Sequence, residues 1–208
     1  MRREDVEQRA MALLSSGDVQ QAGELIARFE ANQPHPRGLG NNWEDGMDAA
    51  SVESARSLLS QDFSELGLSR QDLRNVAVSL ALSAMLGESI DQAAGRLREQ
   101  LSGTIDNDTF STRLRLLGER QYGLEPDSPD NAASMFASYW LMWALHHGAL
   151  DQIRSLPGTG VEILPGRDAS CATGRLRFSH EEVDSVPALP HRWGCGCTYV
   201  GLVSDDDA

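Results

Sequence analysis

The chain has no lysine, no long apolar run and no cysteine before residue 171. All 18 basic residues are arginines, and 31 acidic residues outnumber them, which gives a net charge of -13. Phosphate contacts require clustered basic side chains, so this charge argues against general nucleic-acid binding. No stretch approaches the roughly 18 consecutive apolar residues of a membrane-spanning helix. The first residues also lack the apolar core of a secretion signal, and we therefore expect a cytoplasmic protein with no membrane span.

Cysteine is scarce and is confined to the C-terminal end of the chain, at Cys171, Cys195 and Cys197. An odd number of cysteines without a secretion signal makes a structural disulfide framework unexpected. His191 lies shortly before the last two cysteines, in the sequence Pro-His-Arg-Trp-Gly-Cys-Gly-Cys. We therefore expect any specific chemistry of this protein at its C-terminal end, after a helical body.

Residues 1–156 have the periodicity of a helical body. Apolar residues recur at intervals of three and four, as on one face of a helix, along the segments 4–14, 18–31, 48–59, 69–87, 89–101, 106–122 and 130–149. Ser69 is followed three positions later by an acidic residue, which resembles a capping box, and Asp18 can cap the second segment. Residues rich in proline, glycine or polar side chains predict a loop at 32–47 and a break at 123–129.

The segment from Asp130 to Ala149 is apolar almost all round and rich in aromatic residues. We interpret it as a helix buried in the core, although the same aromatic stripe could form a surface for a partner or a ligand. His146 and His147, near its end, could interact with the helix dipole or bind a metal. Adjacent side chains on a helix point in different directions, so we do not expect both to bind one ion.

After residue 156 the pattern changes from helical to strand-like. Short alternating or apolar segments predict strands at Val161–Leu164, Arg175–Ser179 and Thr198–Val203. The cysteines and His191 fall in the turns between them, as in small sheets that a zinc ion holds together. We therefore predict a small β module over 157–208, which ends in an acidic tail. The predicted fold is mainly α: a multi-helix body with a small C-terminal β element stapled by a metal, α+β overall.

The favoured interpretation of the cysteines and the histidine is a structural zinc site with one ion per chain. Structural zinc is held tetrahedrally by four cysteine or histidine ligands, here Cys171, His191, Cys195 and Cys197. Gly196 lets the backbone bend tightly, so that both flanking sulfurs can reach one ion. A closed shell of four protein ligands leaves no position for a reacting water, and such an ion would contribute to folding.

Different interpretations of the same residues stay open. The cysteines could be small buried apolar residues without a metal, or the pair Cys195–Cys197 could be a redox site. One of these thiols could be a nucleophile with His191 as its base, although no third orienting residue stands out. An open zinc site is a further possibility, in which the remaining ligand or a general base is supplied by Asp168, His180 or Glu181.

The C-terminal elements follow a definite order. A helix at 130–149 precedes a strand at 161–164, an acidic turn that contains Cys171, and the ending Pro187–Cys197. In this order they resemble the end of the phage Mu F-like minor head proteins, also called head morphogenesis proteins. That family typically has two cysteines in the turn and a compact Pro-His-Cys-x-Cys ending. Here Gly174 replaces the second cysteine, and two extra residues separate the histidine from the C-x-C pair.

The resemblance implies a non-enzymatic protein that assists capsid assembly or DNA packaging at the phage portal and head interior. We therefore predict a structural or assembly protein with a structural zinc site, with portal or capsid proteins as partners, located in the cytoplasm or, if phage-encoded, in the virion. The alternative is a metal- or thiol-dependent enzyme of unknown substrate that uses Cys195-Gly196-Cys197 and His191. No phosphate-binding loop, dinucleotide fingerprint or metalloprotease motif is present. A homo-oligomer is compatible with both hypotheses.

Overall fold

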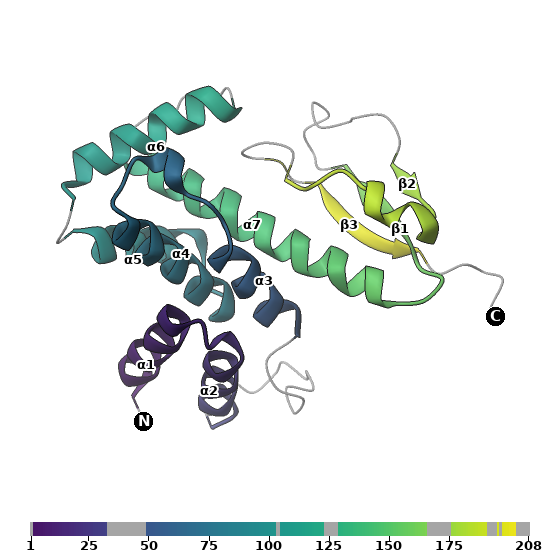
Figure 1. Cartoon of the computed structure of the whole chain (residues 1–208), viewed down its shortest axis with the longest axis horizontal. Helices are drawn as coiled ribbons and strands as arrows, with labels where there is room; N and C mark the ends of the chain where they lie inside the picture. The colour runs from purple at the N-terminus through teal and green to yellow at the C-terminus, as the bar shows by residue number, and fades with distance from the viewer. Residues whose placement is uncertain are drawn as a thin grey trace.

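The computed structural model describes residues 2–32, 49–102, 105–122, 129–165, 176–190, 195 and 197–202. The chain is mainly helical, and a small antiparallel sheet follows the last long helix (Figure 1). This confirms the predicted mainly α fold with a small C-terminal β element, while the metal staple stays a prediction. None of the helices in the described ranges combines the length and the apolarity needed to cross a membrane.

The helical body agrees closely with the periodicity of the sequence. Its elements are α1 (Arg3–Ser16), α2 (Val19–Ala31), α3 (Ala49–Leu59), the 3-10 helix η2 (Ser64–Leu66), α4 (Arg70–Met85), α5 (Ile90–Leu101), α6 (Asn107–Tyr122) and α7 (Pro129–Ser155). Helix α4 is central, because it packs against α1, α3, α5 and α7. Most of the predicted loop at 32–47 and break at 123–129 lies outside the described residues.

Side-chain caps explain where several helices begin. The hydroxyl of Ser69 accepts a hydrogen bond from the backbone N–H of Asp72 at 3.2 Å, which confirms the predicted start of α4. Ser89 and Gln92 form a capping box at the start of α5. Helix α2 also begins after Asp18, but the expected capping bond is absent, because that carboxylate accepts the hydroxyl of Ser16 at 2.9 Å.

A single cluster of buried apolar side chains fills the body and draws on α1 to α7. Its largest fully buried members are Leu14, Ile26, Leu58, Leu66, Leu80, Leu82, Leu97, Leu101, Phe110, Leu114 and Phe136. Trp140 on α7 packs edge-on against Phe63, with ring centroids 4.9 Å apart. The aromatic stripe of α7 is therefore core packing in this part, although Leu145 on another face is 49% exposed and α7 is not buried all round.

A largely buried ion-pair network ties α1 to the turn between α4 and α5. The guanidinium of Arg96 donates to the carboxylate of Glu7 at 3.1 Å and to that of Glu88. Glu88 also accepts the hydroxyl of Ser83 at 2.7 Å, and its side chain is 5% exposed. Glu7 lies 89 positions from Arg96 in the sequence, so the network fixes tertiary structure rather than a single helix.

The sheet has the strand order β2-β1-β3 and is antiparallel throughout. Its elements are β1 (Gly160–Leu164), β2 (Arg177–Phe178) and β3 (Thr198–Leu202), with a 3-10 helix η4 (His180–Ser185) after β2 that the sequence did not predict. Strand β2 is shorter than the predicted 175–179. A Cβ atom at Gly160 would lie 2.6 Å from the backbone oxygen of Phe178, so the close approach of β1 and β2 requires glycine there.

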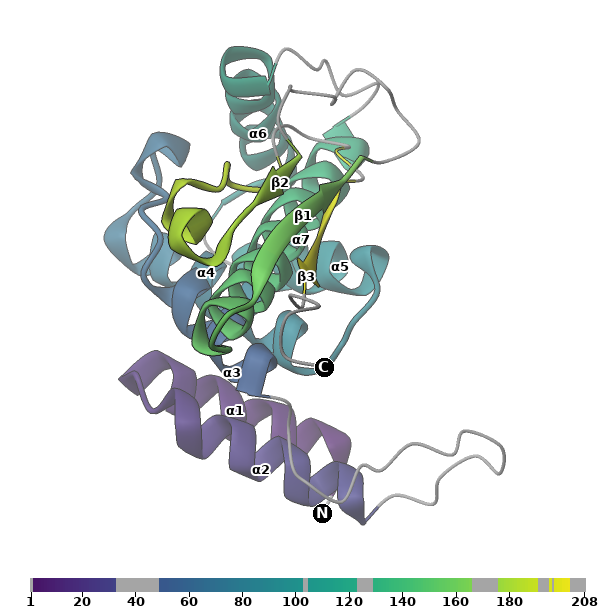
Figure 2. The ribbon, with the colours of Figure 1, turned by 90° about the vertical axis from the view of Figure 1, so that its right-hand side faces the viewer.

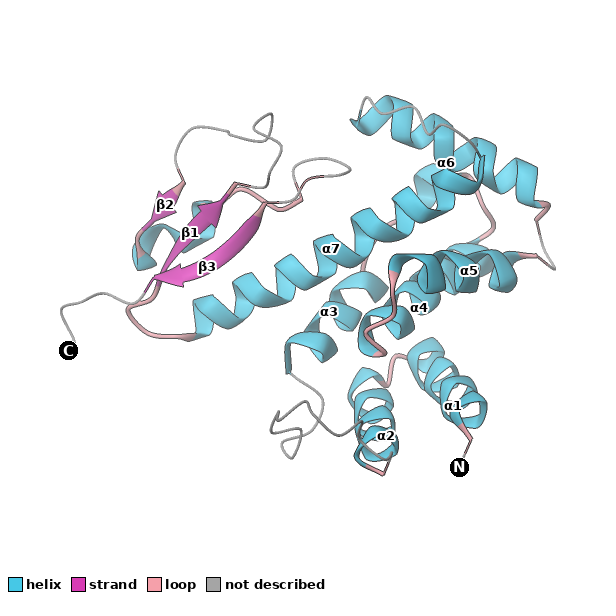
Figure 3. Cartoon of the chain, turned by 180° about the vertical axis from the view of Figure 1, so that it is seen from behind, coloured by secondary structure: helices cyan, strands magenta, loops and turns pink. Residues whose placement is uncertain are grey.

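The sheet lies beside the C-terminal half of α7, as Figures 2 and 3 show from two sides. A second apolar cluster fills this junction, and it includes Leu150 and Ile153 of α7 as well as strand residues. Because α7 contributes to both clusters, it connects the helical body to the sheet. The predicted division between 1–156 and 157–208 stays a prediction, and the second cluster begins within α7.

Candidate functional site

Cys195 and Cys197 lie immediately before β3 and are both buried. Their side chains are 6% and 1% exposed, and both belong to the apolar cluster between the sheet and α7. Neither forms a disulfide. The structure therefore brings together two of the four predicted zinc ligands in the interior of the C-terminal region.

The inward direction of both sulfurs follows from the two-residue period of an extended chain. Cys195, Cys197 and Tyr199 are buried, whereas Thr198 and Val200 are exposed. Alternate residues thus line one face, which packs against the rest of the module. Because Cys195 and Cys197 are two positions apart, both thiols lie on the same side of the chain as Tyr199, which is the inward side of β3.

Tyr199 connects the cysteine-bearing strand to its surroundings. Its hydroxyl donates a hydrogen bond to the backbone oxygen of Pro187 at 2.6 Å, and burial raises the pKa of Tyr199 to about 12. Its ring packs edge-on against His146 of α7, with centroids 5.6 Å apart. Sequence reasoning missed this residue, although the alternation of Cys195, Cys197 and Tyr199 was a signal that could have found it.

His146 and His147 have different surroundings, as expected for neighbours on a helix. His146 is buried beside Tyr199, its Nε2 has no hydrogen-bond partner in the described part of the chain, and burial lowers its pKa. His147 stacks on Trp143 at 4.9 Å, and its Nε2 lies 3.7 Å from a carboxylate oxygen of Asp151. The two imidazoles therefore do not converge on one ion.

The remaining predicted ligands are only partly described. Cys171 and His191 lie outside the described residues, and so does Asp168, which an open zinc site could use. His180 and Glu181 are exposed on η4, and Nδ1 of His180 lies 3.2 Å from the backbone oxygen of Thr159. Within the described ranges, no three histidine, cysteine or carboxylate side chains are placed to hold a metal ion. The described residues thus include two of the four predicted ligands as buried thiols, and Cys171 and His191 stay predictions.

Comparison of the chain with family models, with curated proteins and with solved structures finds no match. The resemblance to the phage minor head proteins therefore stays a prediction.

A small cavity lies next to Tyr199, on the side of α7 that carries His147. Its volume is about 120 Å³, and its walls are Trp143, His147, Leu150, Arg154, Val186, Ala188, Leu189 and Tyr199. Pockets for drug-sized ligands usually have about 300 to 1,000 Å³, so this cavity is too small for such a molecule. Arg154 at its wall is also paired with Asp151 at 2.9 Å.

Proposed function

We propose that the protein is a non-enzymatic structural or assembly protein of the phage minor head type, whose C-terminal module a zinc ion holds together. The burial of Cys195 and Cys197 in one apolar cluster carries this proposal. A nucleophilic or redox thiol has to reach a substrate or a second thiol, and reactive cysteines are partly exposed. Sulfurs enclosed by apolar side chains fit a structural role instead.

The order of the elements supports the same proposal. The long helix α7 leads into β1, the short β2 follows, and the C-x-C pair comes immediately before β3. This agrees with the helix, strand, hairpin and Cys-x-Cys ending of the minor head proteins that the chain resembles. On this proposal the partners are portal or capsid proteins, and the protein acts in the cytoplasm or, if phage-encoded, in the virion.

The donor chemistry fits zinc. Two buried thiols, with the third cysteine and the histidine of the same region, form the sulfur and nitrogen set that structural zinc prefers. In the proposed module Cys171, His191, Cys195 and Cys197 hold the ion. A bound zinc supplies cross-linking energy to a sheet whose apolar cluster is small, and the chain contributes the enclosure that excludes water.

The test is the metal content of untagged protein prepared without chelator, with reactive thiols counted in parallel. We expect about one zinc per chain and three thiols that react only after chelation. Cys195→Ser and His191→Ala should each lose the zinc, whereas His180→Ala, a histidine of the same module on η4, should retain it. Hydrogen exchange should become faster in β1 and β3 of the first two variants, with α4 unchanged.

Two results would contradict the zinc assignment: no bound metal in the wild type, or full zinc occupancy in Cys195→Ser. Rapid reaction of Cys195 or Cys197 with a thiol reagent in the native protein would favour the enzyme hypothesis. The assembly role has its own test, because the intact chain should copurify with a portal or capsid protein encoded in the same genome. If no such protein copurified although zinc was bound, the zinc module would stand and the proposed assembly role would be wrong.

A further inference from the structure

Strand β3 is the outer strand of the sheet on the side of α7, and its outer backbone edge is open (Figure 3). The N–H of Ile163 donates to the backbone oxygen of Leu176 at 2.7 Å, so Ile163 and Val161 direct their backbone groups toward β2. Their partners in β3 are Tyr199 and Gly201, whose backbone groups therefore point away from the sheet. No backbone group in the described part of the chain pairs with them there. Gly201 is exposed, and because glycine has no side chain, its exposed surface is backbone.

Strand β3 carries none of the features that usually protect an exposed edge. Edge strands of soluble proteins typically bear charged side chains, prolines or bulges, or they are very short. The sequence Thr-Tyr-Val-Gly-Leu has no charge and no proline, and its five residues pair with β1 in an unbroken register. Val200, on the outer face of the sheet, is 37% exposed. The edge can thus accept one further strand.

Strand β3 lies on α7, whereas η4 packs against the other two strands. The ring of Tyr199 contacts His146, and a Cβ atom at Gly201 would lie 3.7 Å from Cγ1 of Ile153. The 3-10 helix η4 contacts β1 and β2. The free edge of β3 is therefore above the side of α7 that faces away from η4.

This side of α7 is apolar and incompletely covered. On a helix, the residues at i-4 and i+3 flank residue i on one side, and the residue at i-3 lies on the other. Trp143, three positions before His146, lines the small cavity beside the segment that follows η4. Met142 and Ala149 are therefore on the side of the free edge, where both are half-buried. Leu145, which is exposed, lies next to them and completes an apolar α7 strip.

We propose that the outer edge of β3 and the α7 strip together bind one extended segment of another protein, which joins the sheet as a fourth strand. The backbone groups of Tyr199 and Gly201 pair with the segment, and its alternate apolar side chains lie on the strip. The net charge of -13 favours a segment with basic residues at its ends. The proposal depends neither on zinc binding nor on the assembly role.

A second copy of this chain does not fit the same edge. Antiparallel pairing of two β3 strands about a two-fold axis would place the strands about 4.8 Å apart, with both α7 helices on the same face. Packed helices need about 8 to 10 Å between their axes. Because α7 lies under β3 in each copy, the two helices would overlap. An extended segment with no helix beneath it meets no such obstacle.

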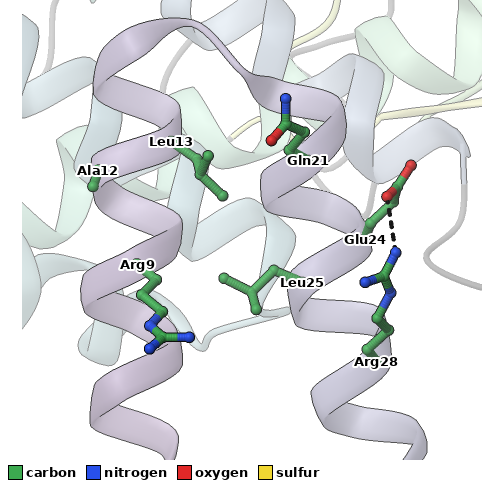
Figure 4. Close-up of a pocket in the computed structure, with 7 residues that line it drawn as sticks. All are labelled: Arg9, Ala12, Leu13, Gln21, Glu24, Leu25 and Arg28. Atoms are coloured by element: carbon green, nitrogen blue, oxygen red, sulfur yellow. Dashed lines mark hydrogen bonds and ion pairs between the residues drawn. The ribbon is translucent and has the colours of Figure 1, made fainter.

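The larger groove of about 620 Å³ between α1 and α2 lacks these features (Figure 4). Leu13 and Leu25, in its middle, already pack against the core cluster of the body. Glu24 and Arg28 form an ion pair at 3.2 Å along it, so the groove presents both charges. The backbone of both helices is bonded internally and offers no edge to an extended chain. The groove is therefore a reference region for the test.

The test is NMR of the full isotope-labelled chain with a synthetic peptide of alternating valine and threonine between arginines. In the free protein, the amides of Tyr199 and Gly201 should exchange with solvent faster than that of Val200, which points toward β1. Peptide up to about 1 mM, a concentration at which weak complexes form, should slow exchange of these two amides. The amides of Leu13 and Leu25 in the groove should be unaffected.

Two methylated forms of the peptide show whether it binds as a strand. Methylation of every second backbone nitrogen removes the N–H groups along one edge of the extended peptide and leaves the other edge intact. The form methylated on the edge that faces β3 should bind at least tenfold more weakly, whereas the other form should bind like the parent peptide. Equal affinity of the two forms would overturn the proposal.

Leu145→Gln should weaken binding of the parent peptide about tenfold, because it removes an apolar contact from the strip. Leu116→Gln is the matched control, since it makes the same change at an exposed leucine of α6. It should bind like the wild type, and circular dichroism should show that both variants are folded. Slow exchange of Tyr199 and Gly201 in the free protein would contradict the open edge. No protection of these amides at the highest peptide concentration, or changes confined to the α1–α2 groove, would also overturn the proposal.

Discussion

The helical body and the C-terminal sheet are held together in different ways. The body buries large aliphatic and aromatic side chains from α1 to α7 in one cluster. The sheet has a much smaller cluster, two of whose members are Cys195 and Cys197. A region that buries little apolar surface needs further stabilisation to stay folded, usually from disulfides, metal ions or contacts with another subunit. The cysteines are concentrated where the apolar core is smallest.

Helix α7 links the two regions, and different parts of its length belong to each. Phe136, Leu141 and Ala144 belong to the cluster of the body, whereas Leu150 and Ile153 belong to the cluster of the sheet. The sheet therefore rests on a helix whose first part is anchored elsewhere. Loss of the body should remove the support of the sheet, whereas loss of the sheet should leave most of the body folded.

The largest effect is expected from a matched pair of core substitutions, Phe136→Ala and Phe178→Ala. Phe136 is fully buried on α7, and its loss should lower the free energy of unfolding of the whole protein by about 3 to 5 kcal/mol. Phe178 is 8% exposed on β2, and its loss should act on the sheet. Urea unfolding followed by circular dichroism, with hydrogen exchange of α4 and β1, measures both. If hydrogen exchange in α4 became faster to the same extent in both variants, the body would depend on the sheet as much as the sheet depends on the body, which contradicts this expectation.

The body and the sheet also differ in how far the sequence predicted them. Local signals located the helices, because apolar spacing and caps such as Ser69 act within one turn. Helix α7 extends beyond the predicted Ala149 to Ser155, because Leu150 and Ile153 are buried against strands that come later in the chain. The pairing of Arg96 with Glu7, 89 positions away, has no local signal either.

The candidate site was predictable only in part. The clustering of cysteines at the C-terminal end indicated the region, and the structure brings Cys195 and Cys197 into one buried cluster. The alternation that directs both inward was present in the sequence. The contact of Tyr199 with His146 was not, since it depends on how β3 lies on α7.

A smaller effect should come from Glu88→Gln in the body, and it should depend on pH. Burial alone raises the pKa of Glu88, but hydrogen bonds from Arg96 and Ser83 and the nearby arginine charges outweigh it and bring the pKa below the ordinary 4.5. A lowered folded-state pKa stabilises the fold above pH 4.5, and this contribution is lost as the pH falls through the folded-state value.

Replacing this carboxylate by an amide should therefore cost about 2 kcal/mol at neutral pH, because charged hydrogen bonds contribute about 1.5 to 3 kcal/mol. The cost should shrink as the pH falls through the lowered folded-state pKa of Glu88, because the wild type then loses the same contribution. Urea unfolding at several pH values measures it. Glu53→Gln is the control, because its ion pair with Arg56 is exposed and should contribute no more than about 0.5 kcal/mol. A pH-independent cost for Glu88→Gln would show that shape, not charge, decides its effect.

The smallest effect should come from Tyr199→Phe in the sheet. The substitution removes the hydrogen bond to the backbone oxygen of Pro187 and keeps the ring against His146, so it should cost about 1 kcal/mol. Hydrogen exchange should become faster in β3 and stay unchanged in α4.

The raised pKa of Tyr199 provides a second readout. The folded state keeps the phenol proton between the ordinary 10 and about 12, so the wild type loses stability as the pH rises through this range. The variant lacks this loss, and its disadvantage should disappear near pH 11. If the free energies of unfolding of the wild type and the variant differed by the same amount at pH 8 and pH 11, the hydroxyl would not stabilise the contact between β3 and the segment that contains Pro187. The sheet would then depend on its cysteines and its packing on α7 alone.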